Sequence, residues 1–188
     1  MGETKRTNND VITVGSCKAY ITEFTGTVPE TEVLCVEDNL LGWVKSGATI
    51  KYNQSSSTFQ DDLGKKRKTI ITEDSAEAAL GVITWNGETL GKLASTARVS
   101  QNADKTRRIV KIGGVGNDNG KSYVLCLHHE DKADGDVWYR IVGKNTAGFE
   151  LAYKIDSETT VNPTFTAEAM DNEGTLIIYE EEIVTAAG

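Results

Sequence analysis

The sequence predicts a mainly β protein, a β-sandwich or barrel with one flanking α-helix, and three observations support this. Short segments in which apolar and polar residues alternate recur roughly every ten residues. Eighteen glycines can supply tight turns, whereas the chain has only two prolines. One segment alone carries the spacing of an amphipathic helix. With 188 residues, we expect a single domain that buries a sizeable core.

The expected organisation is a polar N-terminal arm followed by one β domain. Residues 1–10 are charged without periodicity, so we expect them to be flexible or ordered by a partner. Residues 11–188 form the domain, in which we expect two hairpins, 107–112 with 123–129 and 138–142 with 147–155. The other predicted strands lie at 11–24, 31–36, 44–52, 69–72, 74–85, 161–165 and 175–183.

The predicted helix covers residues 86–95. Asn86 is a favourable N-cap, and Glu88 lies in the first turn, where the helix dipole favours a negative charge. Apolar residues then follow at positions i, i+3, i+4 and i+7, namely Leu90, Leu93, Ala94 and Ala97. A single apolar stripe on a short helix predicts that it packs against a sheet.

A long polar segment separates two predicted strands. Residues 53–68 span sixteen positions and contain only two apolar side chains, Phe59 and Leu63. Compact domains rarely keep such a connection unless something outside the domain uses it. We therefore predict a projecting β-hairpin arm that docks on another subunit, its charges setting the register; a solvated, mobile hairpin is the alternative. The proposed contact residues are Asn53, Phe59, Asp61, Asp62, Leu63, Lys65, Lys66, Arg67 and Lys68.

Composition excludes several classes of partner. The net charge of −8 should repel polyanions, so sequence-specific DNA binding is not expected. The three cysteines, Cys17, Cys35 and Cys126, are widely spaced without a C-x-x-C motif, which favours reduced thiols in a cytoplasm. The polar N-terminus does not resemble a signal peptide, and no apolar run reaches the ~20 residues of a membrane helix. We expect no membrane partner.

No catalytic or metal-binding constellation is evident, so we expect neither an enzyme nor a cofactor. The segment 120–122 matches the end of a phosphate-binding loop, but Val115 replaces its first glycine and a strand follows. His128 and His129 stand near Cys126 and Glu130 without further ligands at metal spacing, which favours an accidental pair at a strand end.

Three tryptophans leave a second class of function open. Trp43, Trp85 and Trp138 could stack on sugar rings, as in a β-sandwich module that binds carbohydrate or another ligand. Trp85 immediately precedes the predicted helix, and the other two open strands. Anchoring in a core or an interface explains them at least as well.

Residues 42–99 resemble a known family of structural proteins. The resemblance lies in GWVKSGATIKY, the DDLGK of the arm, the returning KTIITED and ITWNGETLGKLASTARV, in this order and spacing. These segments are similar to the tail tube (major tail) proteins of long-tailed, non-contractile bacteriophages and prophages of Gram-positive bacteria. About a third of the chain is covered, and residues 100–188 agree only in strand content.

The resemblance implies a structural virion protein that is made and assembled in the host cytoplasm. Hexameric rings would stack into a hollow tail tube around the tape measure protein, between the tail terminator and the distal tail or baseplate proteins. Strands of neighbouring subunits would join into one inner barrel, and residues 53–68 would contact the next ring. The inner tube of a contractile tail or of a tail-like bacteriocin is the closer alternative.

The same resemblance implies that double-stranded DNA passes through the lumen without sequence-specific binding. An acidic protein fits this role, because a surface that does not neutralise phosphates lets the duplex slide. The candidate acids for the lumen are Glu73, Asp74 and Glu77.

Overall fold

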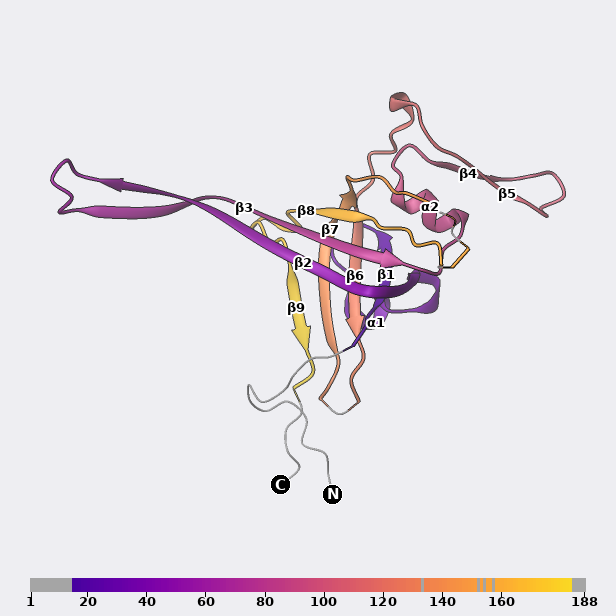
Figure 1. Ribbon diagram of the computed structural model, residues 1–188, viewed down its shortest axis with the longest axis horizontal. Helices are drawn as coiled ribbons and strands as arrows, with labels where there is room; N and C mark the ends of the chain where they lie inside the picture. The colour runs from indigo at the N-terminus through magenta and orange to yellow at the C-terminus, as the bar shows by residue number, and fades with distance from the viewer. Residues whose placement is uncertain (1–14, 133, 152, 154, 157, 184–188) are drawn as a thin grey trace, which may run out of the picture.

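The computed structural model describes residues 15–132, 134–151, 153, 155–156 and 158–183 (Figure 1). The N-terminal arm expected at residues 1–10 lies outside this part. The mainly β prediction is confirmed, because one large antiparallel sheet dominates the described chain. Its strands are β1 (Lys18–Glu23), β2 (Leu40–Gln60), β3 (Arg67–Val82), β6 (Tyr123–His129), β7 (Val137–Asn145), β8 (Thr164–Glu168) and β9 (Ile178–Glu181).

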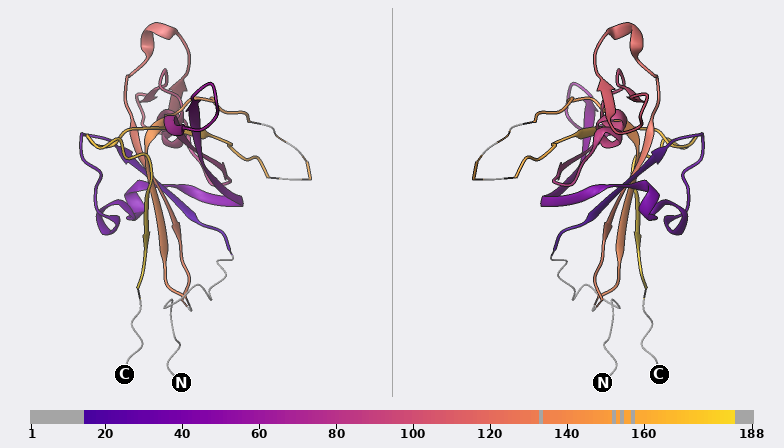
Figure 2. Two further views of the ribbon diagram at one scale, coloured as in Figure 1. Left: turned by 90° about the vertical axis from the view of Figure 1, so that its left-hand side faces the viewer. Right: turned by 90° about the vertical axis from the view of Figure 1, so that its right-hand side faces the viewer.

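The strand pairings close the sheet into a small barrel. Strands follow the order β6-β1-β2-β3-β8-β7, and β7 pairs back onto β6, while β9 pairs with the first half of β7 on the edge that β8 occupies farther along. Closure removes most free edges of the sheet, which would otherwise be sites of unwanted pairing. The barrel is seen obliquely in Figure 1 and from two sides in Figure 2, with the long hairpin β2–β3 crossing it.

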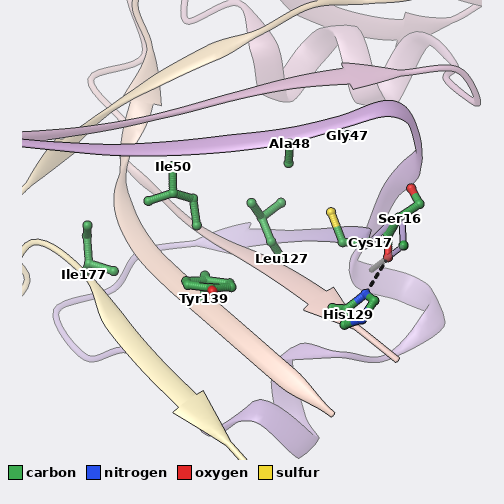
Figure 3. A pocket seen from close by; sticks show the side chains of 10 residues that line it. Ser16, Cys17, Gly47, Ala48, Ile50, Leu127, His129, Tyr139 and Ile177 are labelled. Atoms are coloured by element: carbon green, nitrogen blue, oxygen red, sulfur yellow. Dashed lines mark hydrogen bonds between the residues drawn. The ribbon is translucent and has the colours of Figure 1, made fainter. Parts of the chain in front are cut away.

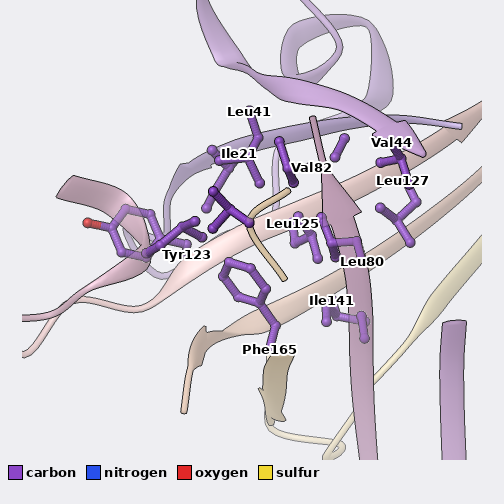
Figure 4. Close-up of a cluster of buried hydrophobic side chains, with 14 residues drawn as sticks. Ile21, Leu41, Val44, Leu80, Val82, Tyr123, Leu125, Leu127, Ile141 and Phe165 are labelled. Atoms are coloured by element: carbon purple, nitrogen blue, oxygen red, sulfur yellow. The ribbon is translucent and has the colours of Figure 1, made fainter. Parts of the chain in front are cut away.

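Alternating side chains divide the core into two clusters. The interior cluster gathers residues from β1, β2, β3, β6, β7 and β8 around Phe165, which is fully buried (Figure 4). The second cluster lies on the outer face of β1, β6 and β7 and includes Tyr20, Leu34 and Cys126. Strand β6 is therefore buried on both faces, which explains why its sequence is almost continuously apolar.

The predicted helix is confirmed as α2 (Gly87–Leu93). The side chain of Asn86 accepts hydrogen bonds from the backbone N–H groups of Glu88 (2.7 Å) and Thr89 (3.2 Å), and the Thr89 hydroxyl accepts from the Asn86 N–H. This reciprocal cap satisfies donors that a helix end leaves unpaired. Leu90 and Leu93 face the interior cluster, as the apolar stripe predicts.

Replacing Asn86 with Ala should lower the free energy of unfolding by about 1 kcal/mol, because the first-turn N–H groups lose their acceptor. Urea titration followed by circular dichroism measures this loss. Asn162→Ala is the matched control, since its exposed side chain caps no helix, and it should change stability by less than about 0.5 kcal/mol. Equal effects of the two substitutions would contradict the role given to the cap.

One predicted strand is wrong. Residues 31–36 form α1 (Thr31–Leu34), a single turn that is followed by the 3-10 turn η1 (Glu37–Asn39). Thr31 and Leu34, three positions apart, are both buried, which is the spacing of one helical face. The alternation of β-branched residues in so short a segment does not distinguish this turn from a strand.

Both predicted hairpins are also wrong. Residues 108–111 form β5 and pair with β4 (Arg98–Gln101), not with β6, which lies between β1 and β7. The described residues of 147–155 form no strand; Phe149 and Leu151 pack on the core, whereas Tyr153 and Ile155 are exposed. Strand β7 pairs instead with β6, which directly precedes it in the chain, and with β8 and β9, which follow it.

Candidate functional site

The most prominent candidate site is the hairpin that extends beyond the barrel. We define the long arm as residues 53–75, from the pair Asn53 and Ser75 to the tip. In the arm every side chain is exposed except Ser57, which is half-buried, whereas Ala76 is buried at the barrel wall. The β2–β3 ribbon projects far to the left of the barrel in Figure 1. The hairpin prediction is confirmed, and its returning limb is longer than the predicted 53–68.

The tip of the long arm is a tightly closed loop. The N–H of Asp61 donates to the carbonyl of Lys66 (3.1 Å), and the N–H of Lys66 donates to Oδ1 of Asp61 (2.7 Å). The N–H of Gly64 donates to the carbonyl of Asp61 (2.9 Å), with Gly64 at a φ of 67°, a left-handed conformation that favours glycine. Asp61 therefore stabilises the loop through its own hydrogen bonds. The neighbouring acid, Asp62, is the candidate for a contact with another chain.

Apolar side chains on the long arm are exposed to an unusual degree. Leu63 at the tip is 76% exposed, and Phe59 and Ile71 are 60% and 63% exposed. Phe59 and Ile70 lie on one face of the ribbon, and Ile71 lies on the other. These side chains contribute little to the stability of the monomer, and exposed apolar residues of this kind are candidates for contact with another chain.

The cations of the long arm form no ion pair within the described part of the chain. Lys65, Lys66, Arg67 and Lys68 make no ion pair with any residue that the structure describes. Exposed charges of this kind contribute little to folding but can steer and align two surfaces that approach each other.

Both edges of the long arm are unpaired. Strand β2 pairs with β1 only over Leu40–Trp43, and β3 pairs with β8 only over Glu77–Ala79. Farther out, no third strand lies beside 53–60 or 67–75 among the described residues. The N–H and C=O groups that point outward from such edges can form a ladder with another chain.

The three acids proposed for a lumen do not share one face. Glu73 and Glu77 point to the side opposite the barrel interior, and Glu77 pairs with Lys51 at 3.4 Å. Asp74 lies on the same side as buried Ala76 and accepts a hydrogen bond from the Tyr52 hydroxyl (3.1 Å). A single surface can therefore present Glu73 and Glu77 together, but not Asp74 with them.

A second projecting hairpin escaped the sequence analysis. We define the short arm as residues 98–111, formed by β4 and β5 (Figure 1). It carries five basic residues and one acid, a net charge of +4 in a chain of net charge −8. An ion pair between Arg108 and Glu88 (2.6 Å) ties it to α2. The signal that could have found it is the turn sequence Asn102-Ala103-Asp104-Lys105 between two short alternating segments.

The two arms end in loops of the same design. In the short arm, the N–H of Asn102 donates to the carbonyl of Arg107 (3.1 Å), and the N–H of Arg107 donates to Oδ1 of Asn102 (2.8 Å). Lys105 takes the left-handed conformation, with a φ of 55°, that Gly64 takes in the long arm. Each loop is thus pinned by an Asx side chain and places basic residues on its returning strand.

The histidines are engaged in packing on opposite sides of β6. His128 lies 2.8 Å from Oδ2 of Asp136 and stacks on Trp138, while Nδ1 of His129 lies 2.9 Å from the Ser16 carbonyl oxygen. In the described part of the chain, no group of three or more His, Cys, Asp and Glu side chains is arranged so that it could hold a metal ion. The structure thus separates the two histidines, while Nδ1 of His128 stays 3.9 Å from Oε1 of Glu130.

The tryptophans do not form a common platform. Trp85 packs on the interior cluster and donates to the Thr159 carbonyl (3.2 Å), and Trp138 packs against the outer cluster. Trp43 is half-exposed, with the ammonium of Lys18 5.1 Å from the centre of its ring. Stacking on sugar rings commonly needs an open aromatic face. Of the three tryptophans only Trp43 could offer one, and the Lys18 ammonium already lies over the Trp43 ring.

A pocket of about 400 Å³ opens on the barrel beside β2 and β7 (Figure 3). Its walls are mostly apolar, and Cys17 and His129 both contribute to them. Burial raises the pKa of the Cys17 thiol, and within the described chain no hydrogen bond joins it to His129. The pocket therefore holds an unactivated thiol and suits an apolar group better than a charged substrate.

No protein-family model matches this chain, and no curated protein matches its sequence. Among the residues that the structure describes, no helix is long and apolar enough to cross a membrane. The function must therefore be argued from the two arms and from the barrel that holds them.

Proposed function

We propose that this protein is a self-assembling structural subunit, the tail tube protein of a long-tailed, non-contractile bacteriophage. Hexameric rings of the chain stack into a hollow tube around the tape measure protein, and double-stranded DNA later passes through it. The observation that carries this proposal is the long arm, an exposed ribbon with two unpaired edges, exposed apolar residues and unpaired cations.

The unpaired edges support association of identical chains. A strand edge of this length is a liability for a monomer, and pairing it with a neighbouring copy removes the liability. A head-to-tail contact that closes gives a ring, and one that continues along an axis gives a tube. The barrel supplies a rigid base for both contacts, because β2 and β3 run without interruption from its wall into the arm.

Charge complementarity supports contact between the arms and the body of another copy. The short arm has a net charge of +4, and residues 61–68 at the tip of the long arm carry four bases and two acids, a net charge of +2, while the whole chain has a net charge of −8. The rest of the surface is therefore strongly acidic and attracts the arms of a neighbour. Such complementarity fixes register and speeds association.

The proposed partners follow from the proposed role. The tape measure protein occupies the lumen during assembly, and the tail terminator and the distal tail or baseplate proteins bound the two ends of the tube. Assembly takes place in the bacterial cytoplasm, and the product is part of the virion. The inner tube of a contractile tail or of a tail-like bacteriocin uses the same contacts and is the alternative within this class.

Electron microscopy tests the proposal directly. Purified full-length chain, concentrated or mixed with an initiator complex, should form rings or tubes of uniform width in negative stain. A particle that stays monomeric by light scattering under every condition tried would refute self-assembly. Specific binding of the monomer to a glycan array would instead favour the carbohydrate-binding class.

Replacing Lys65 with Glu should slow tube growth by roughly tenfold at low salt and reduce its dependence on ionic strength, because the tip then repels the acidic neighbour. Light scattering at several salt concentrations measures this. Lys132→Glu is the matched control, since Lys132 is also exposed but lies on a loop of the barrel. Equal slowing by both variants would show that only net charge matters.

A further inference from the structure

The thiols of Cys35 and Cys126 lie side by side although 91 positions separate them in the chain. Their sulfur atoms are 3.6 Å apart. Cys126 is fully buried on the outer face of β6, and Cys35 is half-buried directly after α1. Both belong to the outer cluster, whereas Cys17 packs against the interior cluster on the other side of the sheet.

We propose that Cys35 and Cys126 form an oxidisable dithiol that a hydroperoxide converts into an intramolecular disulfide, which ties α1 to the barrel. The more accessible Cys35 is the thiol that attacks the oxidant, and buried Cys126 is the thiol that resolves the product. This inference does not depend on the proposed tube function.

The surroundings allow the bond to close. The sulfur atoms must approach from 3.6 Å to about 2.05 Å. Helix α1 is a single turn of four residues, so a small shift of this segment and rotation of the Cys35 side chain can supply the movement. Strand β6 stays fixed, because it is paired on both edges and buried on both faces.

A buried arginine holds this site together. Arg140, the cross-strand partner of Cys126, is 7% exposed and donates from Nη1 to the carbonyl of Pro29 (2.9 Å) and from Nη2 to Glu180 (2.5 Å). Thr31 also donates to Glu180, at 3.2 Å. The start of α1 is thereby anchored to β7 and β9, and Cys35 at its other end is placed against Cys126.

The same neighbours activate Cys35. The hydrogen bond from the Cys126 thiol, and after it the positive charge of Arg140, lower the pKa of Cys35 below that of an ordinary thiol. The hydrogen bond to Cys35 and burial raise the pKa of Cys126, which keeps it protonated. The titratable and charged groups around Cys35 are Cys126 of β6, Arg140 of β7, Glu180 of β9, Glu32 of α1 and Tyr20 of β1.

The oxidation balances in two steps. The Cys35 thiolate attacks one oxygen of hydrogen peroxide, the O–O bond breaks, and a sulfenic acid and hydroxide form. Sulfur of Cys126 then attacks Sγ of Cys35, its proton passes to the departing hydroxyl group, and water leaves as the S–S bond forms. Two electrons pass from the two thiols to one peroxide, and a dithiol reductant reverses the change.

The test uses the purified full-length chain and hydrogen peroxide, followed by N-ethylmaleimide in denaturant, so that buried thiols also react, and by intact mass spectrometry. The oxidised chain should accept one maleimide instead of three, and peptide mapping should link Cys35 to Cys126. Its melting temperature should rise by roughly 5 °C, because the bridge closes a long loop, and fall again on reduction.

Cysteine variants distinguish the Cys35–Cys126 disulfide from other products of oxidation. Cys17→Ser should form the same bridge, and Cys35→Ser should form none; Cys35 is half-exposed, so that variant should keep its fold by circular dichroism. Three results would overturn the proposal. They are a bridge that involves Cys17, a disulfide between two chains, and oxidation of Cys35 to sulfinic acid without any bridge.

The pH dependence of alkylation gives a second readout. A lowered pKa leaves more thiolate at a given pH, so iodoacetamide should modify Cys35 with a midpoint at lower pH than Cys17, whose pKa burial raises. A midpoint for Cys35 at or above that of Cys17 would contradict the activated thiol.

Discussion

Replacing residues 55–73 with an Asn-Gly turn should leave a folded barrel that forms no tubes. Gln54 and Asp74 are paired across the ribbon, so the new two-residue turn closes the hairpin in its native register. The removed side chains are exposed apart from half-buried Ser57 and take no part in either core cluster. The melting temperature should therefore change little, while the contact that we propose between rings should be lost entirely.

The register also dictates how this experiment must be done. Removing residues 55–66 alone would leave residues 67–73 without the strand that pairs with them. Size-exclusion chromatography with light scattering and negative-stain microscopy measure assembly, and circular dichroism measures folding. A variant in which Ser55 is replaced by Ala keeps the arm and serves as the matched control. Long tubes from the shortened chain would rule out the arm as the contact between rings.

Replacing Phe165 with Ala should destabilise the monomer by about 3–5 kcal/mol, a large share of the stability of a typical domain. Phe165 is fully buried on β8 among side chains of the interior cluster, so its removal leaves a cavity that a closed barrel cannot easily fill. Urea unfolding at concentrations too low for assembly gives the midpoint and slope from which the loss is calculated.

Phe59→Ala provides the contrast, because it removes the same side chain from the long arm, where Phe59 is 60% exposed. We expect less than about 0.5 kcal/mol of lost stability but a clear defect in tube formation. If both substitutions destabilised the monomer equally, Phe59 would have a role in the core that the structure does not give it.

Local signals in the sequence account for the elements that were predicted correctly. Asn86 and Glu88 mark the start of α2, and its apolar stripe needs only neighbours one turn away. Likewise the hairpin of β2 and β3 is formed by adjacent strands, and its loop at residues 61–66 follows from Asp61 and Gly64. These are features in which propensity and pattern agree over a few residues.

The errors lie in which strands pair, both between consecutive strands and between distant ones. The segment 147–155 alternates as a strand does, yet β7 pairs with β8 and β9 instead, and β6 pairs with β1 across about a hundred residues. A pattern of alternation reports one buried face but does not say which strand lies beside it. The short arm is a local hairpin, and it was missed because its second strand was assigned to a hairpin with the segment that forms β6.

The sequence by itself determined the mainly β class, the capped helix and the projecting polar hairpin, because each depends on contacts between residues close in the chain. Only the tertiary structure decided that no described strand pairs with either edge of the long arm, and that Cys35 meets Cys126. These facts depend on which distant strands pack together, and that choice is made by the burial of the whole core rather than by any local signal.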